Sequence, residues 1–320
     1  MLHFALRRAL LAAALSGPLA ARAVAAPQSG EWTDPARQRQ LPWLLRLPDD
    51  GGGPWPLVIY SHGLGGSREG GAKWGQAWAD GGIAVLHLQH AGSDLPVLRS
   101  GLAALRAAAS AEQLIARVLD VQFAIGEVTR RGGDGEGPWA QLRRDAIGVA
   151  GHSFGAVTTQ AVAGERFPNG QVLDEPRPRA FIAFSPSSPP HGGSVKAAFG
   201  GVVRPFLGVT GSEDGDPLGT SRTGEPRAAV YDGLPPGRRA LLWLDGADHG
   251  TCGGGRPPGL PNRTLQRRSD LAQRREPAHQ ALIARVSTLW WQAQLRGDEG
   301  AMAALRRLDD LGPGDRWRFD

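Results

Sequence analysis

One serine stands in a pattern typical of a catalytic nucleophile. Ser153 is the centre of the sequence Gly-His-Ser-Phe-Gly at 151–155. A short apolar run, 146–150, precedes the pattern, and a segment of small residues suited to a helix, 156–163, follows it. A serine on a tight turn between a strand and a helix carries its hydroxyl clear of the sheet, because the flanking glycines have no Cβ atoms to clash. The sequence therefore predicts a nucleophile elbow at Ser153.

His249 fits the general base that such a serine requires. A serine hydroxyl attacks a carbonyl efficiently only when a base takes its proton and an acid orients that base. After a nucleophile elbow, the acid and then the histidine follow in the chain, each just past a later strand. His249 follows the predicted strand 239–244, whereas His279, which also lies downstream, falls in a predicted helix. Asp245 and Asp248 are interpreted as turn-forming residues that position His249.

Three acidic residues are candidates for the acid that orients this histidine. They follow the predicted strand 205–210 in the sequence Gly-Ser-Glu-Asp-Gly-Asp-Pro. Asp214 is the preferred acid because it comes where the overhang of that strand ends. Glu213 and Asp216 stay as alternatives, since spacing alone does not fix the geometry of a loop.

Two backbone N–H groups are expected to bind the oxyanion of a tetrahedral intermediate. Each such donor lowers the barrier by about 3 kcal/mol. One is the N–H of Phe154, directly after the serine, and the other is the N–H of Leu64, in the glycine-rich loop after the predicted strand 56–60. His62 in this loop is interpreted as a structural brace, and not as a proton-transfer residue or a metal ligand.

The histidines near position 90 do not form a metal-binding pattern. His87 and His90 flank a predicted strand end, and apart from Asp94 no further group of ligands accompanies them. We interpret them as packing and loop residues. His152, directly before the serine, is expected to shape the elbow or to line the substrate pocket. Serine chemistry needs no cofactor or metal ion, and none is predicted.

Short apolar runs that alternate with helical segments predict the scaffold of these residues. The expected strands are 41–47, 56–60, 82–88, 146–150, 179–185, 205–210 and 239–244. The expected helices are 71–80, 111–130, 156–163 and 278–295, with a small helical excursion over the site at 95–109 and a surface loop at 132–138. Near-continuous apolar strands separated by helices are typical of a mostly parallel sheet covered on both faces. The predicted fold class is therefore α/β.

The N-terminal segment has the features of an export signal. Two arginines precede an apolar stretch, 9–15, and small residues at 21–25 suit a cleavage site. The apolar stretch is too short to cross a bilayer, so we expect an exported protein without stable membrane insertion after signal removal; a membrane anchor is the alternative. We assign 1–26 to the signal peptide and 27–320 to a single catalytic domain with one sizeable core.

The overall composition excludes several classes of protein. Hydrophobic residues make up 41% of the chain and charged residues 21%, which is typical of a globular protein and not of a disordered chain or a membrane bundle. The formal net charge of +5 comes from arginines spread among acids, without the basic block of a nucleic-acid-binding protein. The single cysteine, Cys252, excludes an intrachain disulfide and is predicted to be buried.

Four sequence patterns resemble those of the α/β-hydrolases. They are Ser-His-Gly-Leu-Gly at 61–65, Gln-His-Ala-Gly-Ser-Asp at 89–94, Gly-His-Ser-Phe-Gly at 151–155 and Gly-Ala-Asp-His at 246–249. Within that fold, the chain is most similar to the bacterial relatives of platelet-activating-factor acetylhydrolase that are often described as predicted dienelactone hydrolases. The resemblance covers most of the chain and implies an α/β-hydrolase fold with ester hydrolase activity.

Two features depart from this resemblance. The acetylhydrolase scheme has its acid after the strand that follows the elbow, but here that position falls at 185–187, without a carboxylate. True dienelactone hydrolases use a cysteine nucleophile, which Ser153 replaces, so a dienelactone substrate is not implied. We predict a serine hydrolase that acts on small esters, short-chain or acetyl esters above all, through an acyl-enzyme. An amidase or peptidase with the same triad, and a non-catalytic binding protein on the same fold, are the alternatives.

Overall fold

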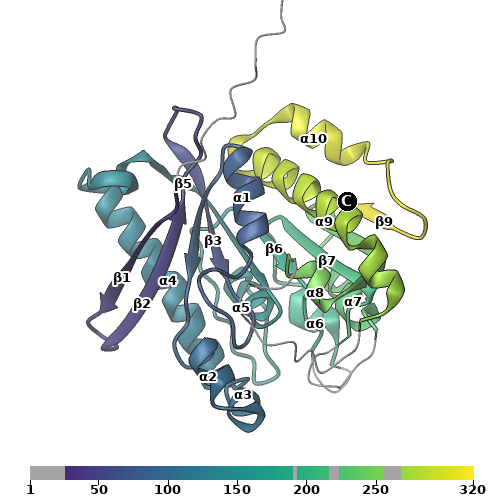
Figure 1. Ribbon diagram of the computed structural model, residues 1–320, viewed down its shortest axis with the longest axis horizontal. Helices are drawn as coiled ribbons and strands as arrows, with labels where there is room; N and C mark the ends of the chain where they lie inside the picture. Colours follow the sequence, from purple (N-terminus) through teal and green to yellow (C-terminus); the bar gives the residue numbers. More distant parts are fainter. Residues whose placement is uncertain (1–25, 190–192, 216–222, 255–267) are drawn as a thin grey trace, which may run out of the picture.

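One sheet of nine strands runs through the described part of the molecule (Figure 1). The computed structural model describes residues 26–189, 193–215, 223–254 and 268–320. The strands are β1 (Gln28–Asp34), β2 (Arg39–Arg46), β3 (Trp55–Ser61), β4 (Ala84–Leu88), β5 (Leu142–His152), β6 (Ala180–Phe184), β7 (Phe206–Glu213), β8 (Arg239–Asp248) and β9 (Arg316–Phe319). Their order in the sheet is β1-β2-β4-β3-β5-β6-β7-β8-β9, and the strands from β4 to β8 are parallel. The antiparallel pairs lie at the two edges of the sheet. The sheet is therefore mostly parallel, which confirms the predicted α/β class.

Helices cover both faces of this sheet (Figure 1). They are α1 (Ala72–Asp80), α2 (Leu95–Arg99), α3 (Leu102–Ala107), α4 (Ala111–Gly133), α5 (Phe154–Ala163), α6 (Val195–Phe199), α7 (Glu225–Gly233), α8 (His249–Cys252), α9 (Asp270–Trp291) and α10 (Glu299–Arg306). A short 3₁₀-helix, η1 (Gly137–Gln141), precedes β5, and a π-helix, η3 (Gln292–Arg296), continues α9. The predicted alternation of strands and helices is therefore confirmed.

Two apolar cores lie on opposite faces of the sheet, because successive side chains of a strand point to opposite sides. On β3, Leu57 and Ile59 belong to the core that α4 and α5 cover. Val58 and Tyr60 belong to the core that α1, α9 and α10 cover. Strands that are buried on both sides explain why the sequence shows continuous apolar runs there and no alternation.

Several C-terminal elements differ from the expectations. The sequence patterns predict neither α10 nor β9. β9 has four residues, half of them exposed, with arginines at alternate positions, so it lacks the apolar run that marks the other strands. The helix predicted at 278–295 starts earlier, as α9, and ends in η3. The loop predicted at 132–138 is shorter, because α4 extends into it and η1 begins within it.

The N-terminal prediction falls mostly outside the described residues. The predicted signal peptide, 1–26, has only its last residue in the described part, and it stays a prediction. Among the residues that the structure describes, no helix combines the length and the apolar character needed to span a membrane. Cys252 is a free and fully buried thiol, as predicted.

Candidate active site

Ser153 lies on a sharp turn between β5 and α5. The last residue of β5 comes directly before it and the first residue of α5 directly after it, and its own φ is 57° and ψ −117°. A positive φ is strained for a residue with a Cβ atom, and such strain is common at functional positions. A Cβ on Gly155 would lie 1.9 Å from the carbonyl oxygen of Ser61, and one on Gly151 would lie 2.3 Å from that of Gly155. Only glycine fits at both flanking positions.

A hydrogen bond joins His249 to Asp214 at the carboxyl ends of β7 and β8. Nδ1–H of His249 donates to Oδ1 of Asp214 over 2.7 Å. Asp214 follows the end of β7 and His249 follows the end of β8, and these two strands are parallel neighbours, so their carboxyl ends lie side by side. Of the alternative acids, Glu213 pairs with Asp248 in the β7–β8 ladder, and Asp216 lies outside the described residues.

The carboxylate of Asp214 is fully buried and surrounded by donors. Oγ1 of Thr210 donates to Oδ2 at 2.7 Å, and Nε of Arg227 lies 3.2 Å from Oδ1. Burial by itself raises the pKa of Asp214, but the charge of Arg227 and the hydrogen bond from His249 outweigh burial and hold the pKa well below its usual range. Asp214 is therefore ionised, and an ionised carboxylate at this position can stabilise a positive charge on the imidazole.

His152 connects His249, the first residue of α8, to the serine turn. Its Nε2–H donates to the backbone oxygen of His249 at 3.0 Å, and the two ring centroids are 4.6 Å apart. Because His152 directly precedes Ser153, this contact holds the start of α8 against the turn. Burial, together with the nearby His249, lowers the pKa of His152 to about 3, so its ring is neutral. Within the described residues, no hydrogen bond joins the side chains of Ser153 and His249.

The Leu64 loop packs against the serine. A Cβ on Gly63 would lie 3.3 Å from Cβ of Ser153. The carbonyl oxygen of Gly63 accepts hydrogen bonds from Nδ1 of His62 at 2.6 Å and from the N–H of Gly66 at 3.0 Å. In a planar trans peptide the N–H points opposite to the carbonyl oxygen, so these two bonds turn the N–H of Leu64 away from His62. His62 therefore braces the loop, as the sequence predicts.

The N–H groups of Leu64 and Phe154 are free of partners among the described residues. In the part of the chain that the structure describes, neither group donates to an acceptor. Phe154 is the first residue of α5, where helix geometry leaves N–H groups without partners and the helix dipole favours an anion. Two unpaired donors beside a strained serine can together bind a developing oxyanion.

The remaining histidine candidates have structural partners. Nδ1 of His87 donates to the carbonyl oxygen of Gly70 at 3.0 Å, and Asp94 accepts a hydrogen bond from Nε2 of Gln89 at 2.9 Å. His90 is buried and hydrogen-bonded through both ring nitrogens. Among the described residues, no group of three or more His, Cys, Asp or Glu side chains is arranged to hold a metal ion.

Sequence reasoning missed the two residues that support Asp214. Thr210 and Arg227 contact its carboxylate, and Arg227 also donates to the carbonyl oxygens of Ser185 and Pro186 at 3.0 Å each. No motif marks either residue: the Arg227 contact forms only when α7 packs against the end of β7, and Thr210 is an ordinary strand residue four positions before Asp214. The one available signal is general: a buried carboxylate needs compensating donors, and the preceding strand is a near source of one.

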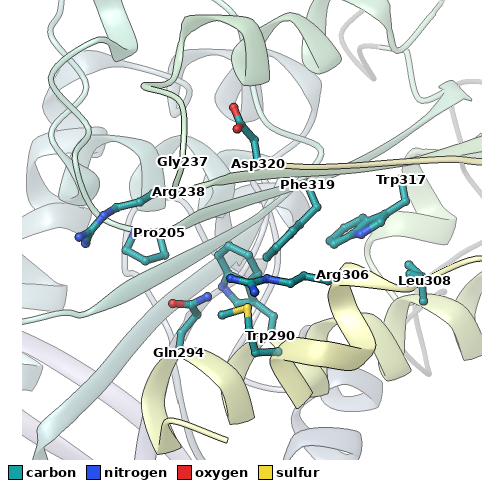
Figure 2. Close-up of a pocket in the computed structure, with 11 residues that line it drawn as sticks. Pro205, Gly237, Arg238, Trp290, Gln294, Arg306, Leu308, Trp317, Phe319 and Asp320 are labelled. Atoms are coloured by element: carbon teal, nitrogen blue, oxygen red, sulfur yellow. The ribbon is translucent and has the colours of Figure 1, made fainter. Parts of the chain in front are cut away.

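A cavity of about 840 Å³ lies at the opposite end of the sheet (Figure 2). Pro205 directly precedes β7, and Gly237 and Arg238 directly precede β8, so these lining residues mark the amino ends of both strands. Trp290 of α9 and Phe319 of β9 also line the cavity. The Asp-His pair lies at the carboxyl ends of the same two strands. The cavity is therefore separate from the serine site.

The fold and the site together define an α/β protein with a mostly parallel sheet and an Asp-His pair at the carboxyl ends of its strands. No model of a known protein family matches the chain, and no curated protein matches it either. The function must therefore be argued from the geometry of these side chains.

Proposed function

We propose that the protein is an α/β-hydrolase that cleaves carboxylic esters with Ser153 as nucleophile, His249 as general base and Asp214 as the acid that orients it. The observation that carries this proposal is the 2.7 Å hydrogen bond from His249 to Asp214, on strand ends next to a strained serine turn. The order Ser, Asp, His along the chain supports it, as does an elbow that joins a strand to a helix. The unpaired N–H of Leu64, between β3 and α1, occupies the loop from which this fold draws an oxyanion donor.

The proposed reaction proceeds through an acyl-enzyme. Substrate binding brings the hydroxyl of Ser153 within hydrogen-bond reach of His249, which takes its proton as the oxygen attacks the ester carbonyl. Asp214 stabilises the imidazolium, and the N–H groups of Leu64 and Phe154 donate to the oxyanion. His249 then protonates the leaving alcohol, and the same histidine activates a water molecule that releases the acid from Ser153.

The acyl group of the substrate is proposed to lie along α2 and α3. A Cβ on Gly65 would lie 3.1 Å from Cβ of Leu98 and 3.2 Å from Cδ1 of Leu105, so the two helices pack directly on the loop that contains Leu64. Leu98 and Leu102 are 36% and 40% exposed. Exposed leucines beside the proposed oxyanion donors offer an apolar surface for an acyl chain, and short-chain esters are the proposed substrates.

Labelling with a fluorophosphonate probe is the direct test. Wild-type protein should be labelled at Ser153 and should hydrolyse p-nitrophenyl acetate, and Ser153→Ala should lose both properties. Ser61→Ala is the matched control, since it removes a buried hydroxyl on β3 and should keep labelling and turnover. Folded wild-type protein that resists the probe contradicts the proposal and favours a non-catalytic binding protein.

Matched esters and anilides separate an ester hydrolase from an amidase or peptidase. We expect p-nitrophenyl esters to be turned over much faster than p-nitroanilides of the same acyl groups. A series from acetate to palmitate then measures the acyl preference, which we expect to favour the short chains. Faster turnover of the anilides would assign the same three side chains to amide hydrolysis.

A further inference from the structure

Arg117 of α4 lies between the two segments that carry the proposed oxyanion donors. Its side chain is fully buried, with 0% exposure. Nε donates to Oγ1 of Thr158 at 2.9 Å, Nη1 donates to Oγ of Ser93 at 2.9 Å, and Nη2 donates to the carbonyl oxygen of His62. The guanidinium carbon also lies 4.7 Å from the centre of the Phe154 ring. One side chain thus contacts both segments.

The contacts of Arg117 connect it to both residues that carry the proposed oxyanion donors, Phe154 and Leu64. Oγ1 of Thr158 accepts from Arg117 and donates to the carbonyl oxygen of Phe154 at 2.9 Å, so this chain of bonds ends on the first residue of α5. On the other side, the carbonyl of His62 comes two residues before Leu64. A shift of the guanidinium would therefore change how the Leu64 loop sits relative to α5.

The burial of this arginine is unfavourable by itself. Within the described ranges no ion pair includes Arg117, and its hydrogen-bond acceptors are two hydroxyls and a carbonyl. Burial lowers the pKa of Arg117 to about 9, against the effect of the nearby Asp120, so the group is still charged at neutral pH. A buried charge destabilises a fold unless it is well paired, and an apolar side chain could fill the same volume. A role in geometry accounts for a cation at this position better than a role in stability.

We propose that Arg117 is a positioning residue, which holds the N–H groups of Leu64 and Phe154 at the separation that an oxyanion requires. This inference rests on the proposed ester hydrolysis. Donors stabilise an oxyanion when they lie about 2.7–3.1 Å from it, so a small relative shift weakens transition-state binding. Binding of the ground-state substrate depends much less on that separation.

The test compares kcat with the affinity for an inhibitor that forms an oxyanion. Arg117→Met should lower kcat for p-nitrophenyl acetate by about 10- to 100-fold, less than the loss of a whole donor, with KM within about threefold of wild type. The affinity for an alkyl trifluoromethyl ketone, which adds to the serine as a tetrahedral oxyanion, should fall by a similar factor. Arg117→Lys keeps the charge but loses the multiple fixed contacts, so its losses should be intermediate.

Arg204 offers a matched control. It also donates to backbone carbonyls, of Glu175 and Pro178, and its guanidinium lies 4.8 Å from the ring centre of Phe181, away from the serine turn. Arg204→Met should lower the thermal stability but leave kcat and the inhibitor affinity unchanged. The contrast between the two variants separates positioning of the donors from general support of the fold.

The outcomes distinguish this inference from the proposed function. Wild-type protein that hydrolyses no ester contradicts both. Active wild type with unchanged kcat in folded Arg117→Met overturns the role of Arg117 alone, and so does a fall in kcat without a parallel fall in inhibitor affinity. If Arg117→Met does not fold, Arg117→Lys decides by the same two measurements.

Discussion

Within the described residues, two aspartate–histidine pairs have a similar hydrogen bond from Nδ1 to the carboxylate but different surroundings. In one, Nδ1 of His249 donates to Asp214 at 2.7 Å, and in the other, Nδ1 of His90 donates to Asp120 at 2.9 Å. Each aspartate also has an arginine partner. The side-chain types and the distances inside the pair therefore do not separate a catalytic pair from a structural one.

The second pair even includes a serine. Oγ–H of Ser61 donates to Nε2 of His90 at 3.0 Å, which completes a Ser61–His90–Asp120 chain. All three side chains are fully buried, whereas the side chain of His249 keeps 20% exposure. Ser61 ends β3 within the parallel ladder and does not lie on a strained turn. Access for a substrate and donors for an oxyanion, and not the three side chains alone, distinguish the proposed site.

The buried pair serves the fold around the Leu64 loop. Asp120 forms ion pairs with Arg37 at 2.9 Å and with Arg39 at 2.8 Å, which connect α4 to the start of β2. The backbone N–H of His90 donates to Nε2 of His62 at 3.0 Å, so the other ring nitrogen of His62 carries the proton. This tautomer lets His62 donate to the carbonyl that orients the loop. The buried pair thus supports the Leu64 loop through the backbone N–H of His90 and through the contact between the His90 and His62 rings.

Replacement of each aspartate by asparagine should show the largest contrast. Asp214→Asn should lower kcat by about 10⁴-fold and leave the fold intact, since the amide favours the wrong tautomer of His249. Asp120→Asn should leave kcat within about tenfold of wild type but lower the free energy of unfolding by about 1.5–3 kcal/mol, because the partly buried Arg37 and Arg39 lose the charge of the buried carboxylate that pairs with them. Steady-state kinetics and urea denaturation of both variants measure the two effects.

Asp216→Asn is the control for the choice of acid, because Asp216 lies outside the described residues and is the remaining alternative. We expect it to keep nearly full activity. If Asp216→Asn loses activity and Asp214→Asn stays active, the residue that orients His249 is Asp216. Equal losses of activity in Asp214→Asn and Asp120→Asn would contradict the division of roles between the two pairs.

The sequence could predict the parts of the fold and site that depend on local patterns. The apolar runs and their order give the parallel strands, and the glycines around Ser153 give the turn. The contact between His249 and Asp214 could also be predicted, since each residue comes directly after a strand and those strands are neighbours. The catalytic roles of these residues stay a prediction.

The contacts that depend on distant parts of the chain could not be predicted. Arg39 and Asp120 are 81 positions apart, and Arg117 contacts α5 and the loops that follow β3 and β4. One signal was present: Arg117 lies one turn from Leu114 and from Val121, on the face of the helix predicted at 111–130 that faces the core. A charge on such a face indicates a buried polar network, but its partners depend on tertiary packing.

Acid should destabilise the protein through its buried histidines. Burial lowers the pKa of His90 to about 4 and the pKa of His87 and His152 to about 3, below the 6.5 of an unperturbed histidine. As the pH falls from 6.5 towards 4, the unfolded chain gains protons that the folded chain does not bind, so the free energy of unfolding falls. Urea denaturation in a series from pH 7 down to pH 4 measures this slope.

His90→Gln sharpens the same measurement. The variant loses one histidine whose pKa is lowered in the folded state, so its free energy of unfolding should depend less steeply on pH across this window than that of wild type. The variant should also be less stable at pH 7, because glutamine cannot reproduce both ring contacts. An unchanged slope would show that the buried pair does not titrate with unfolding.

Removal of a single hydrogen bond to either Asp–His pair should have the smallest effect. Thr210→Val removes the hydroxyl that donates to Oδ2 of Asp214. One hydrogen bond to a carboxylate contributes about 1.5–3 kcal/mol. Part of that loss should appear as a fall in kcat of about 3- to 30-fold. Ser61→Ala removes the donor to His90 and should lower the melting temperature without a comparable fall in kcat. Kinetics and thermal unfolding of the two variants, measured side by side, compare the pairs one bond at a time. A larger fall in kcat for Ser61→Ala than for Thr210→Val would make the buried chain, and not the exposed one, the pair that matters for turnover.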